Sequence, residues 1–576
     1  MGKYPEFIRQ ILFICLIALC LQSLSVLAEE KQPGAAGLSK EEALRLGERI
    51  YREGVLPSGE PVTAVVQGDI PIEGTMFSCE SCHMRSGLGS YEGGVLTTPT
   101  TGKYLYRPLT KYRQLTPAEE ERAPTYLKPV FQALPIRPAY TDETLAAALR
   151  GGIDPAGRRL HSVMPCYLLN NRDMTILVYY LRSLSTEPSP GVTDTTLRFA
   201  TVITDDVTAE EREAMLTPLE NYVQRRNSQA KKFETRAKYG VFAEPMDLTY
   251  RRLSLARWKL KGSPETWRGQ MEEYYRKEPV FALLGGITNG EWRPVHEFSE
   301  EHRIPCIFPI TDFPVISGTD WYTLYFSKGF YQEGEAAARF LGTAAEFPPE
   351  KTVVQIFRDT GEGRAFSTGF QETWRDLGRQ PPVNRILQAG ETITQEFLQH
   401  LADKDRPAVI LLWVGPEVVQ ALEIIAANAN KPEMVYVSSS LMKQGLGKLP
   451  EKARDFTYIT YPYGLSPVKI PSIYTKSAKR SQQNDKVLVN DRRIPAKIHS
   501  LSLLLTDAFM MMGNDFYRDR FLDVIGMQQD RPQPYTDYER LSFGPGQRYA
   551  SKGCYIMQLT HGANPTLVKK SDWVIH

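Results

Sequence analysis

The chain has 576 residues, of which 42% are hydrophobic and 24% charged, a balance typical of a globular protein. One hydrophobic core does not grow to this size, so about two to four domains are expected. The 69 Lys and Arg residues nearly cancel the 67 Asp and Glu residues, which argues against nucleic acid or an anionic membrane surface as a partner.

The first 28 residues carry the features of an export signal. Lys3 and Arg9 precede an apolar run from Ile11 to Leu21, and the pattern Val26-Leu27-Ala28 follows it. This arrangement predicts a secretory signal peptide over residues 1–28. The apolar run is shorter than the roughly 20 residues that cross a bilayer, so an uncleaved anchor is the weaker alternative. We therefore expect a periplasmic protein with no integral membrane segment after cleavage.

A C-x-x-C-H motif is the most specific feature of the chain. It comprises Cys79, Cys82 and His83, and at this spacing two thiols can attach to haem while the adjacent imidazole binds the iron. A zinc site would need a second ligand pair, which the sequence lacks. A thioredoxin-like dithiol would lie between a strand and a helix, whereas Gly68–Gly74 before the motif is rich in turn residues. The motif therefore predicts one covalently bound haem c.

An electron-transfer haem needs a second axial ligand to its iron, and Met164 is the first candidate. It lies in Leu160–Tyr167, where its thioether would raise the reduction potential, whereas the main competitor, His161, would lower it. Three other methionines are weaker alternatives, namely Met76, Met84 and Met174. With His83 and Met164 both bound to iron no coordination position is vacant. We therefore expect single-electron transfer and assign no catalytic residue.

Residues 38–184 resemble a class I cytochrome c domain around these ligands. Ser39–Glu42 indicates a capping box ahead of a helix, and two more helices are predicted at Asp142–Arg150 and Met174–Leu184. The resemblance implies an all-α domain in which the first and last helices cross beside the haem. Two segments depart from the compact family pattern, namely Leu56–Gly74 and Pro99–Pro138.

The remaining cysteines are too few for a disulfide framework. Beyond the signal peptide and the haem motif they are Cys166, Cys306 and Cys554. A bridge between Cys306 and Cys554 is one alternative, and burial as small apolar side chains is the favoured one.

A second domain is expected after a linker at residues 185–196, which is rich in turn residues. Over residues 197–576 short apolar strands alternate with amphipathic helices such as Gly334–Leu341 and Glu417–Ala427. This alternation predicts parallel sheets covered by helices on both faces, and the length indicates two lobes. The strands are expected at Leu197–Ile203, Val280–Leu284, Ile304–Phe308, Thr352–Phe357, Ala408–Trp413 and Met434–Val437.

The order of segments over residues 197–576 resembles the type I periplasmic solute-binding proteins of the branched-chain amino-acid group. The resemblance rests on Phe281–Gly290, Glu301–Thr311, Leu324–Gly329 and Lys351–Gly363. It implies a two-lobed α/β domain that binds a small, amino-acid-like solute at the carboxyl ends of its strands. The residues it places there are Thr288, Asn289, Thr311 and Asp312 in one lobe and Asp359, Thr360, Trp413 and Tyr461 in the other.

A structural interpretation of these residues stays open, because Thr, Asn and Asp at loop starts often only cap the following helix. An amino-acid ligand would also need an anion for its ammonium group. The alternatives for that role are Asp312, Asp359 and Glu391.

The leading hypothesis is a periplasmic fusion. Its cytochrome domain would exchange single electrons with a redox partner protein, and its two-lobed domain would bind a small solute or a protein partner. One alternative is a cytochrome subunit of a dehydrogenase, which would need a catalytic base or organic cofactor in the α/β region, where no nucleotide-binding motif is visible. Another is a transport or sensing receptor with an accessory haem, which would need a permease partner.

Overall fold

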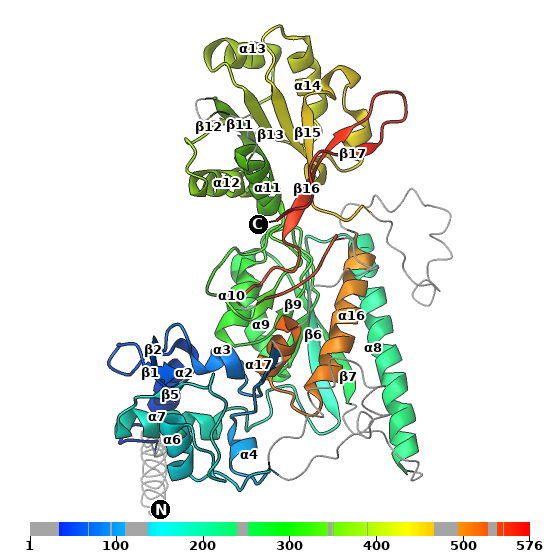
Figure 1. The fold of residues 1–576 in the computed structure, drawn as a ribbon. Coiled ribbons are helices and arrows are strands. Elements are labelled where there is room, and N and C mark those ends of the chain that lie inside the picture. The colour runs from blue at the N-terminus through cyan, green and yellow to red at the C-terminus, as the bar shows by residue number, and fades with distance from the viewer. Residues whose placement is uncertain are drawn as a thin grey trace, which may run out of the picture. The chain divides into compact units, whose positions relative to one another are not determined.

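The chain divides after Glu187 into two compact units, Met1–Glu187 (unit 1) and Pro188–His576 (unit 2) (Figure 1). A computed structural model describes residues 34–66, 68–92, 95–109, 136–238, 251–343, 348, 351–388, 390–465, 493–527, 538–544 and 546–575. The predicted signal peptide and much of Pro99–Pro138 lie outside these residues. Among the helices of the described ranges, none combines the length and the apolar character needed to cross a membrane.

Unit 1 contains the three helices that the sequence predicts. They are α2 (Lys40–Glu53), α6 (Asp142–Gly151) and α7 (Asn171–Ser183). The described residues between α2 and α6 also form two short helices, α3 (Cys79–His83) and α4 (Gly102–Leu105). The side chain of Ser39 accepts a hydrogen bond from the Glu42 backbone N–H, and Thr141 caps α6 in the same way. The cap predicted at Ser39 is therefore confirmed, whereas the full capping box is found at Thr141 and Thr144.

Helices α2 and α7 pack closely where Gly47 meets Tyr180. A Cβ atom added to Gly47 would lie 2.4 Å from the Cβ atom of Tyr180, so only glycine permits this approach. The rings of Tyr51 and Tyr180 lie next to this point, with centroids 5.5 Å apart. The first and last predicted helices of the unit thus pack directly against one another.

Unit 1 also contains a sheet, whereas the sequence predicted helices alone. Strands β1 (Thr63–Val66), β2 (Ile70–Glu73) and β5 (Cys166–Tyr167) form an antiparallel sheet in the order β2-β1-β5. A two-residue pair, β3 (Tyr91–Glu92) and β4 (Val95–Leu96), lies apart from it. The physical reason is the extra segment Leu56–Gly74, which folds into a hairpin and holds the chain just after Met164.

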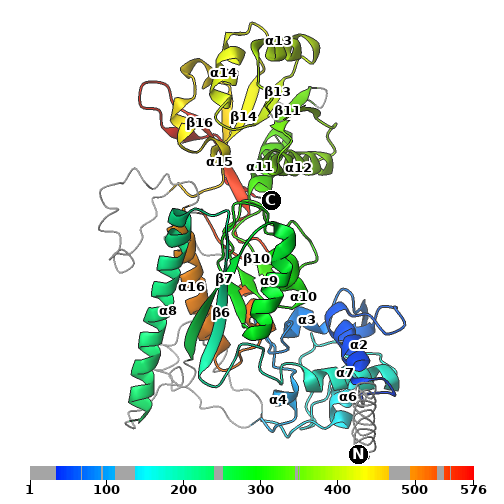
Figure 2. The same ribbon diagram turned by 180° about the vertical axis from the view of Figure 1, so that it is seen from behind.

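Unit 2 consists of two α/β lobes (Figure 2). The first lobe is built on a fully parallel sheet in the order β10-β9-β8-β6-β7. Its strands are β6 (Thr196–Thr204), β7 (Arg252–Leu260), β8 (Ala282–Leu284), β9 (Cys306–Ile307) and β10 (Thr323–Leu324). Its helices are α8 (Ala209–Lys238), α9 (Pro264–Lys277), α10 (Arg293–Glu301), α16 (Ile494–Met512) and α17 (Arg518–Gly526).

The second lobe repeats the same strand order and extends it. Its sheet runs β12-β11-β13-β14-β15-β16-β17, in which β11 to β15 are parallel and β16, β17 and β18 are antiparallel additions. The strands are β11 (Val353–Arg358), β12 (Val383–Leu387), β13 (Val409–Trp413), β14 (Met434–Ser438), β15 (Thr457–Tyr461), β16 (Gly553–Leu559), β17 (Leu567–Lys569) and β18 (Val574–Ile575). The helices are α11 (Phe330–Thr343), α12 (Gly361–Asp376), α13 (Gln395–Lys404), α14 (Val418–Ala427) and α15 (Ser439–Met442).

Each sheet of unit 2 is buried on both faces. In β13, Ile410 and Leu412 belong to one apolar cluster with α13 and α14, while Leu411 and Trp413 belong to another with α11 and α12. In the first lobe α8, α16 and α17 cover one face of the sheet, and α9 and α10 cover the other (Figures 1 and 2). The predicted architecture of two lobes with parallel, helix-covered sheets is therefore confirmed.

The described chain crosses between the lobes at three places. The first crossing segment, Tyr325–Gly329, joins β10 to α11, and the second follows β15. The third crossing segment, Tyr549–Lys552, leads into β16. Backbone hydrogen bonds join the first and third segments: Ala550 N–H donates to Tyr325 O at 3.0 Å, and Ser551 N–H donates to Phe326 O at 2.7 Å. The loops that end several strands meet at these crossings.

Candidate functional site

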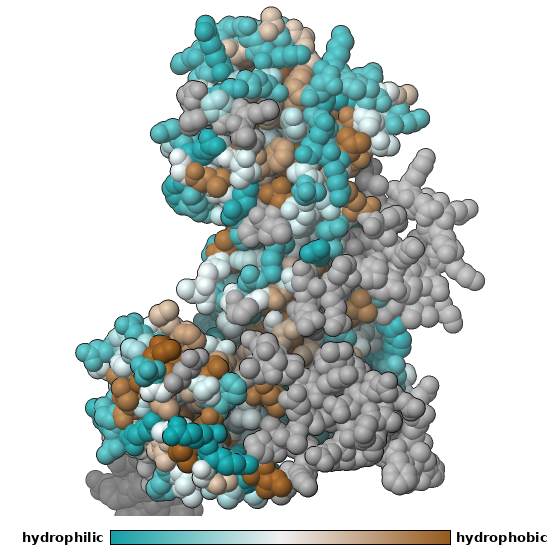
Figure 3. Space-filling model, viewed as in Figure 1, coloured by the Kyte–Doolittle hydropathy of each residue, from teal (hydrophilic) through white to brown (hydrophobic). Residues whose placement is uncertain are grey.

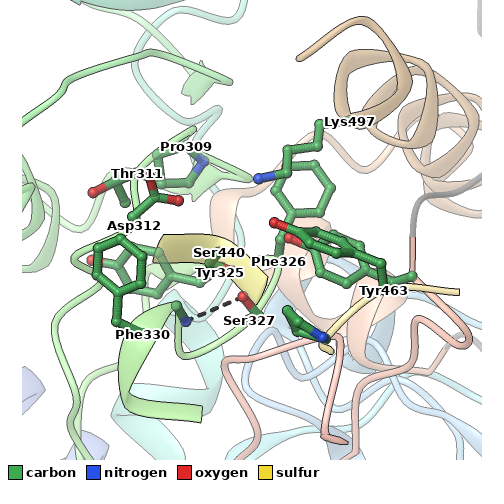
Figure 4. Close-up of a pocket in the computed structure, with 13 residues that line it drawn as sticks. Pro309, Thr311, Asp312, Tyr325, Phe326, Ser327, Phe330, Ser440, Tyr463 and Lys497 are labelled. Atoms are coloured by element: carbon green, nitrogen blue, oxygen red, sulfur yellow. Dashed lines mark hydrogen bonds between the residues drawn. The ribbon is translucent and has the colours of Figure 1, made fainter. Parts of the chain in front are cut away.

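A small hollow of about 20 Å³, partly open to solvent, lies beside the crossing segments of unit 2 (Figure 4). We call it the first hollow. Its walls come from the loop after β9, the first crossing segment, α15, the segment after β15, α16 and Tyr538. The lining residues are Pro309, Thr311, Asp312, Tyr325, Phe326, Ser327, Gly329, Phe330, Ser440, Pro462, Tyr463, Lys497 and Tyr538.

Two opposite charges face each other in the first hollow. The ammonium group of Lys497 and the carboxylate of Asp312 point into it from opposite walls (Figure 4). Lys497 is only 5% exposed, and no carboxylate of the described chain lies within 4.0 Å of its ammonium group. Its nitrogen lies 5.8 Å from the ring centroids of both Phe326 and Tyr538. The hollow thus offers a buried cation with aromatic neighbours and one nearby carboxylate.

The backbone of Asp312 is held against the first crossing segment. Gly329 has a φ of 58°, and a Cβ atom there would lie 2.3 Å from the Asp312 carbonyl oxygen. Both the positive φ and the close approach require glycine at this position. The close backbone contact between Gly329 and Asp312 therefore fixes the position of the wall that carries the carboxylate.

Tyr325 is fixed in the wall by a chain of buried polar groups. His296 Nδ1 lies 2.9 Å from the Tyr325 hydroxyl, and His296 Nε2 lies 2.8 Å from Asp320 Oδ2. Both rings are almost fully buried and stack with centroids 5.9 Å apart. A buried hydroxyl bonded in this way keeps one orientation, so Tyr325 presents a preorganised surface.

A buried carboxyl group, Glu333, lies behind Ser440. It is 1% exposed, and its Oε2 accepts a hydrogen bond from the Thr460 hydroxyl at 2.5 Å. Burial raises the pKa of Glu333 to about 7, although hydrogen bonds from Ser440, Thr460 and Ser438 oppose that rise. A titratable group thus sits directly beside a residue that lines the hollow.

Two of the eight predicted solute-binding residues, Thr311 and Asp312, line the first hollow. Thr288 and Asn289 instead brace their own loop. Asp206 Oδ2 accepts hydrogen bonds from Thr288 Oγ1 at 3.3 Å and from the Asn289 backbone N–H at 3.0 Å. These two residues follow β8, and the hollow forms beyond β9, where the chain crosses to the second lobe.

The four predicted residues of the second lobe do not line the first hollow either. Thr360 caps α12 by accepting from Gly363 N–H at 3.3 Å, and Asp359 lies 3.3 Å from Arg364. Trp413 is 1% exposed, and its Nε1 donates to Gln355 Oε1 at 2.9 Å within the core. The Tyr461 hydroxyl accepts from Arg493 at 3.1 Å. Capping and core packing account for Thr360 and Trp413.

Lys497 and Tyr463 were not identified from the sequence. Lys497 lies in a mostly apolar helix, and its ammonium group lies over the ring of Phe326. The two residues are more than 170 positions apart in the sequence, so no local pattern connects them. One sequence feature could have identified Lys497: it is the single Lys or Arg within Ile494–Met512, a helix whose other residues are mostly apolar. A charge in such a helix is rarely buried without a specific reason.

The C-x-x-C-H motif of unit 1 forms the short helix α3. His83 Nδ1 lies 2.9 Å from the Thr98 carbonyl oxygen, and His83 Nε2 is buried without a partner among the described residues. Burial lowers the pKa of His83 to about 4, so the ring is neutral and its Nδ1 donates to Thr98. Nε2 consequently carries a lone pair with nothing to accept, as in a metal-ligating histidine oriented by a backbone carbonyl.

The other residues named for the haem site lie in different surroundings. Cys79 is buried with Sγ 3.7 Å from the Tyr167 hydroxyl, and neither Cys79 nor Cys82 is in a disulfide. Met164 is half-buried and packs against the core of unit 1, whereas His161 is exposed. Cys306 and Cys554 are separate buried thiols, so no disulfide joins them.

Unit 1 exposes apolar residues at its surface (Figure 3), and several of the large ones adjoin the motif or Met164 in the sequence. Met76 and Phe77, just before Cys79, are 73% and 43% exposed, and Val163 is 46% exposed. Exposed apolar residues grouped along both segments mark a surface that another apolar body can cover. Together with the unsatisfied His83 Nε2, these residues fit a haem group.

Comparison with known proteins shows a family similarity within unit 2. Residues 260–468 match the model of the periplasmic binding protein family. The match covers part of the first lobe and most of the second. No curated protein matches the sequence.

Solved structures of solute-binding proteins are similar over about two thirds of the chain. A branched-chain amino-acid transporter protein from Thermus thermophilus with bound valine is 11% identical, with 66% of this chain and 97% of that chain covered and a TM-score of 0.45. A leucine-binding protein from Thermotoga maritima is 12% identical, with 66% and 99% covered and a TM-score of 0.42. A solute-binding protein from Rhodopseudomonas palustris in complex with 3,4-dihydroxybenzoic acid is 13% identical, with 66% and 98% covered and a TM-score of 0.43.

Proposed function

We propose that unit 2 binds a small organic acid of the amino-acid type in the first hollow. The observation that carries this proposal is Lys497, a buried cation without a carboxylate of the described chain within 4.0 Å. A buried charge needs a counter-charge, and a ligand carboxylate would supply it. Asp312 on the facing wall would receive the ammonium group of the same ligand. The ring of Phe326 would pack against the apolar part of the ligand.

Isothermal titration of the full-length protein tests this assignment with L-leucine, L-phenylalanine and 3-phenylpropionate as probes. We expect saturable binding of at least one probe, and a tenfold or greater loss of affinity in Lys497→Met, which keeps the apolar stem but removes the charge. Lys351→Met is the matched control, because Lys351 pairs with Glu433 on the exposed surface. Equal affinity of Lys497→Met and the unsubstituted protein would contradict the proposal, as would a folded protein that binds no probe.

We propose that unit 1 holds one haem c and carries single electrons. Cys79 and Cys82 would hold the haem covalently, His83 would bind its iron through Nε2, and Met164 would bind on the other side. The support is the pairing of His83 Nδ1 with Thr98 O, which leaves Nε2 buried and unsatisfied in the described chain. The haem would supply the one-electron redox couple. Thr98 orients the imidazole of His83, the burial of His83 excludes water from the ring, and apolar side chains of unit 1 would cover the haem.

Optical spectra of the exported protein in both redox states test the haem assignment. We expect a covalently bound, low-spin haem whose methionine-to-iron charge-transfer band is lost in Met164→Ala. Cys79→Ser with Cys82→Ser should yield protein without covalent haem. If the band persists in Met164→Ala, a methionine other than Met164 binds the iron. A protein that matures without any covalent haem would overturn the proposal.

We further propose that the protein works in the periplasm, exported by residues 1–28, and that its electron partner is another protein. The support for export is the N-terminal sequence pattern and the family match of unit 2. Intact-mass measurement of the periplasmic fraction should find a chain that begins at residue 29. A chain that retains its N-terminal 28 residues would show that the segment is not cleaved.

A further inference from the structure

The buried carboxyl group of Glu333 lies directly behind the wall of the first hollow. Glu333 is 1% exposed, and Thr460 Oγ1 donates a hydrogen bond to its Oε2 at 2.5 Å. Ser440, which lines the hollow (Figure 4), also hydrogen-bonds to this carboxyl group. Glu333 is not itself one of the lining residues. It therefore responds to a bound solute through charge and through Ser440, rather than by direct contact.

Segments that line the first hollow surround Glu333. Phe330 precedes it by about one turn of α11, and Pro462 follows Thr460 just beyond β15. Ser440 comes from α15, and the loop after β9 contributes a carboxylate. A change of charge in the hollow therefore acts on Glu333 across a single layer of side chains.

Glu333 has no counter-ion in the described chain. Among the described residues no nitrogen of Lys, Arg or His lies within 4.0 Å of its carboxyl oxygens. Burial raises the pKa of Glu333 to about 7, hydrogen bonds from Ser440, Thr460 and Ser438 oppose that rise, and the negative charge of Asp312 adds to it. Near neutral pH the group is therefore divided between its neutral and ionised forms.

Other groups also face this part of α11. Cys554 on β16 is a buried thiol, and burial raises its pKa so that it stays neutral. Helix α12 packs on α11 beside Glu333 through Phe366 and Phe370, which carry no charge. Glu335, further along α11, pairs with Lys328, with Oε1 and Nζ 2.7 Å apart. Of these neighbours, the carboxylate in the first hollow is the one that a solute would neutralise.

We propose that binding of an amino-acid solute in the first hollow is coupled to the loss of a proton from Glu333. This inference rests on the proposed solute site. An ammonium group at Asp312 cancels the negative charge that favours the neutral form of Glu333, so its O–H bond breaks and the proton passes to the buffer. A solute that carries only a carboxylate instead neutralises Lys497, and the loss of that positive charge favours the neutral form. The direction of proton exchange thus separates amino acids from simple carboxylic acids.

The coupling makes the affinity for an amino acid depend on pH. Because the bound protein holds fewer protons than the empty one, affinity rises as the pH passes through the pKa of Glu333. We expect the affinity for L-phenylalanine to be about threefold or more higher at about pH 8 than at about pH 6. The affinity for 3-phenylpropionate should stay constant or fall over the same range.

Isothermal titration of the full-length protein at about pH 7, in PIPES and in Tris, measures the protons exchanged, because the two buffers differ in ionisation enthalpy. L-phenylalanine should release about 0.2–0.4 proton per molecule bound, and 3-phenylpropionate should release none or take protons up. Glu333→Gln, which cannot titrate, should exchange no proton with either probe. Its affinity for L-phenylalanine should be the same at about pH 6 and about pH 8.

Glu335→Gln is the matched control, because Glu335 is a buried carboxyl group on the same helix that pairs with Lys328. This variant should keep the proton release, and circular dichroism establishes that both variants are folded. Equal binding heats of L-phenylalanine in the two buffers overturn the inference and leave the solute site standing, whether or not Glu333→Gln folds. Proton release that persists in Glu333→Gln, or that disappears in Glu335→Gln, also overturns it. If neither probe binds the folded protein, the solute site and this inference fail together.

Discussion

The carboxyl group of Glu333 accepts a hydrogen bond of 2.5 Å from the hydroxyl group of Thr460, at a position that is 1% exposed. Glu333 lies at the start of α11, just after the first crossing segment, and Thr460 lies near the end of β15, just before the second. The contact therefore joins the segment by which the chain enters the second lobe to the strand by which it leaves that lobe. Its strength depends on the protonation state of one carboxyl group.

This contact predicts a pH dependence of stability. Burial raises the pKa of Glu333 from 4.5 to about 7 in the folded protein, so between these values the folded state binds more protons than the unfolded state. The stabilisation from the neutral carboxyl is fully present below about pH 4.5 and is lost as the pH rises through 7, a change of about 3 kcal/mol.

Glu333→Gln stays neutral at every pH and should not show this loss. Thermal unfolding of unit 2 in both proteins at about pH 5 and about pH 8 measures the difference. The variant should become more stable relative to the unsubstituted protein at the higher pH. Unfolding midpoints that shift in parallel with pH would show that Glu333 does not titrate in this range.

Asp312→Asn should change which ligands the first hollow selects. If Asp312 receives the ammonium group of an amino acid, the amide should weaken L-phenylalanine about tenfold or more. It should leave 3-phenylpropionate, which has the same ring and carboxylate but no ammonium group, unchanged or tighter. Titration of both probes into both proteins measures the two ratios, and an equal loss for both probes would mean that Asp312 acts only on the fold.

Gly47→Val should destabilise unit 1. The added side chain meets the Cβ atom of Tyr180 at 2.4 Å, so α2 and α7 must move apart, at a cost of about 1–3 kcal/mol. Gly151→Ala is the control within the same unit, because no atom lies within 4 Å of its added Cβ. Amide hydrogen exchange in α2 and α7 as a function of denaturant reports on unit 1. Equal stability of the two variants would show that the helix contact is loose.

Arg518→Met should destabilise the first lobe strongly. The Arg518 guanidinium is buried and donates to the carbonyl oxygens of Val280 at 2.6 Å, Phe281 at 3.0 Å and His302 at 3.1 Å. Its removal leaves these buried acceptors unsatisfied, at a cost of about 3 kcal/mol or more. Arg375→Met removes an exposed guanidinium and is expected to have little effect. A comparable midpoint for both variants would argue that water replaces the Arg518 contacts.

Local patterns in the sequence predicted the elements of the fold well. The strand expected at Thr352–Phe357 is β11, and the helix expected at Glu417–Ala427 is α14, each shifted by about one residue. Both predictions rest on the alternation and periodicity of apolar residues, which the burial of each element enforces. The sheet of unit 1 was missed because Leu56–Gly74 was treated only as a departure from a helical family.

The walls of the first hollow were harder to predict because their residues meet only through the tertiary fold. Thr311 and Asp312 follow a recognisable strand, but Lys497 and Tyr538 come from segments after the second lobe. Trp413 shows the opposite case: a polar nitrogen on a large ring suggested a ligand contact, and the buried Gln355 satisfies that nitrogen instead. In each case a local pattern gives the element, but not the partner that the element meets.

The first lobe is built from two distant parts of the chain. Ile498, Leu501 and Phe521 pack into the same apolar cluster as Leu197 and Phe281. During synthesis the ribosome therefore releases β6 to β10 well before the helices that cover one face of their sheet, whereas β11 to β15 and the helices between them emerge together. A nascent chain of this protein exposes an uncovered apolar sheet while the second lobe is being made. The lobe that is translated first therefore receives two of its helices only after β11 to β15 of the second lobe have been made.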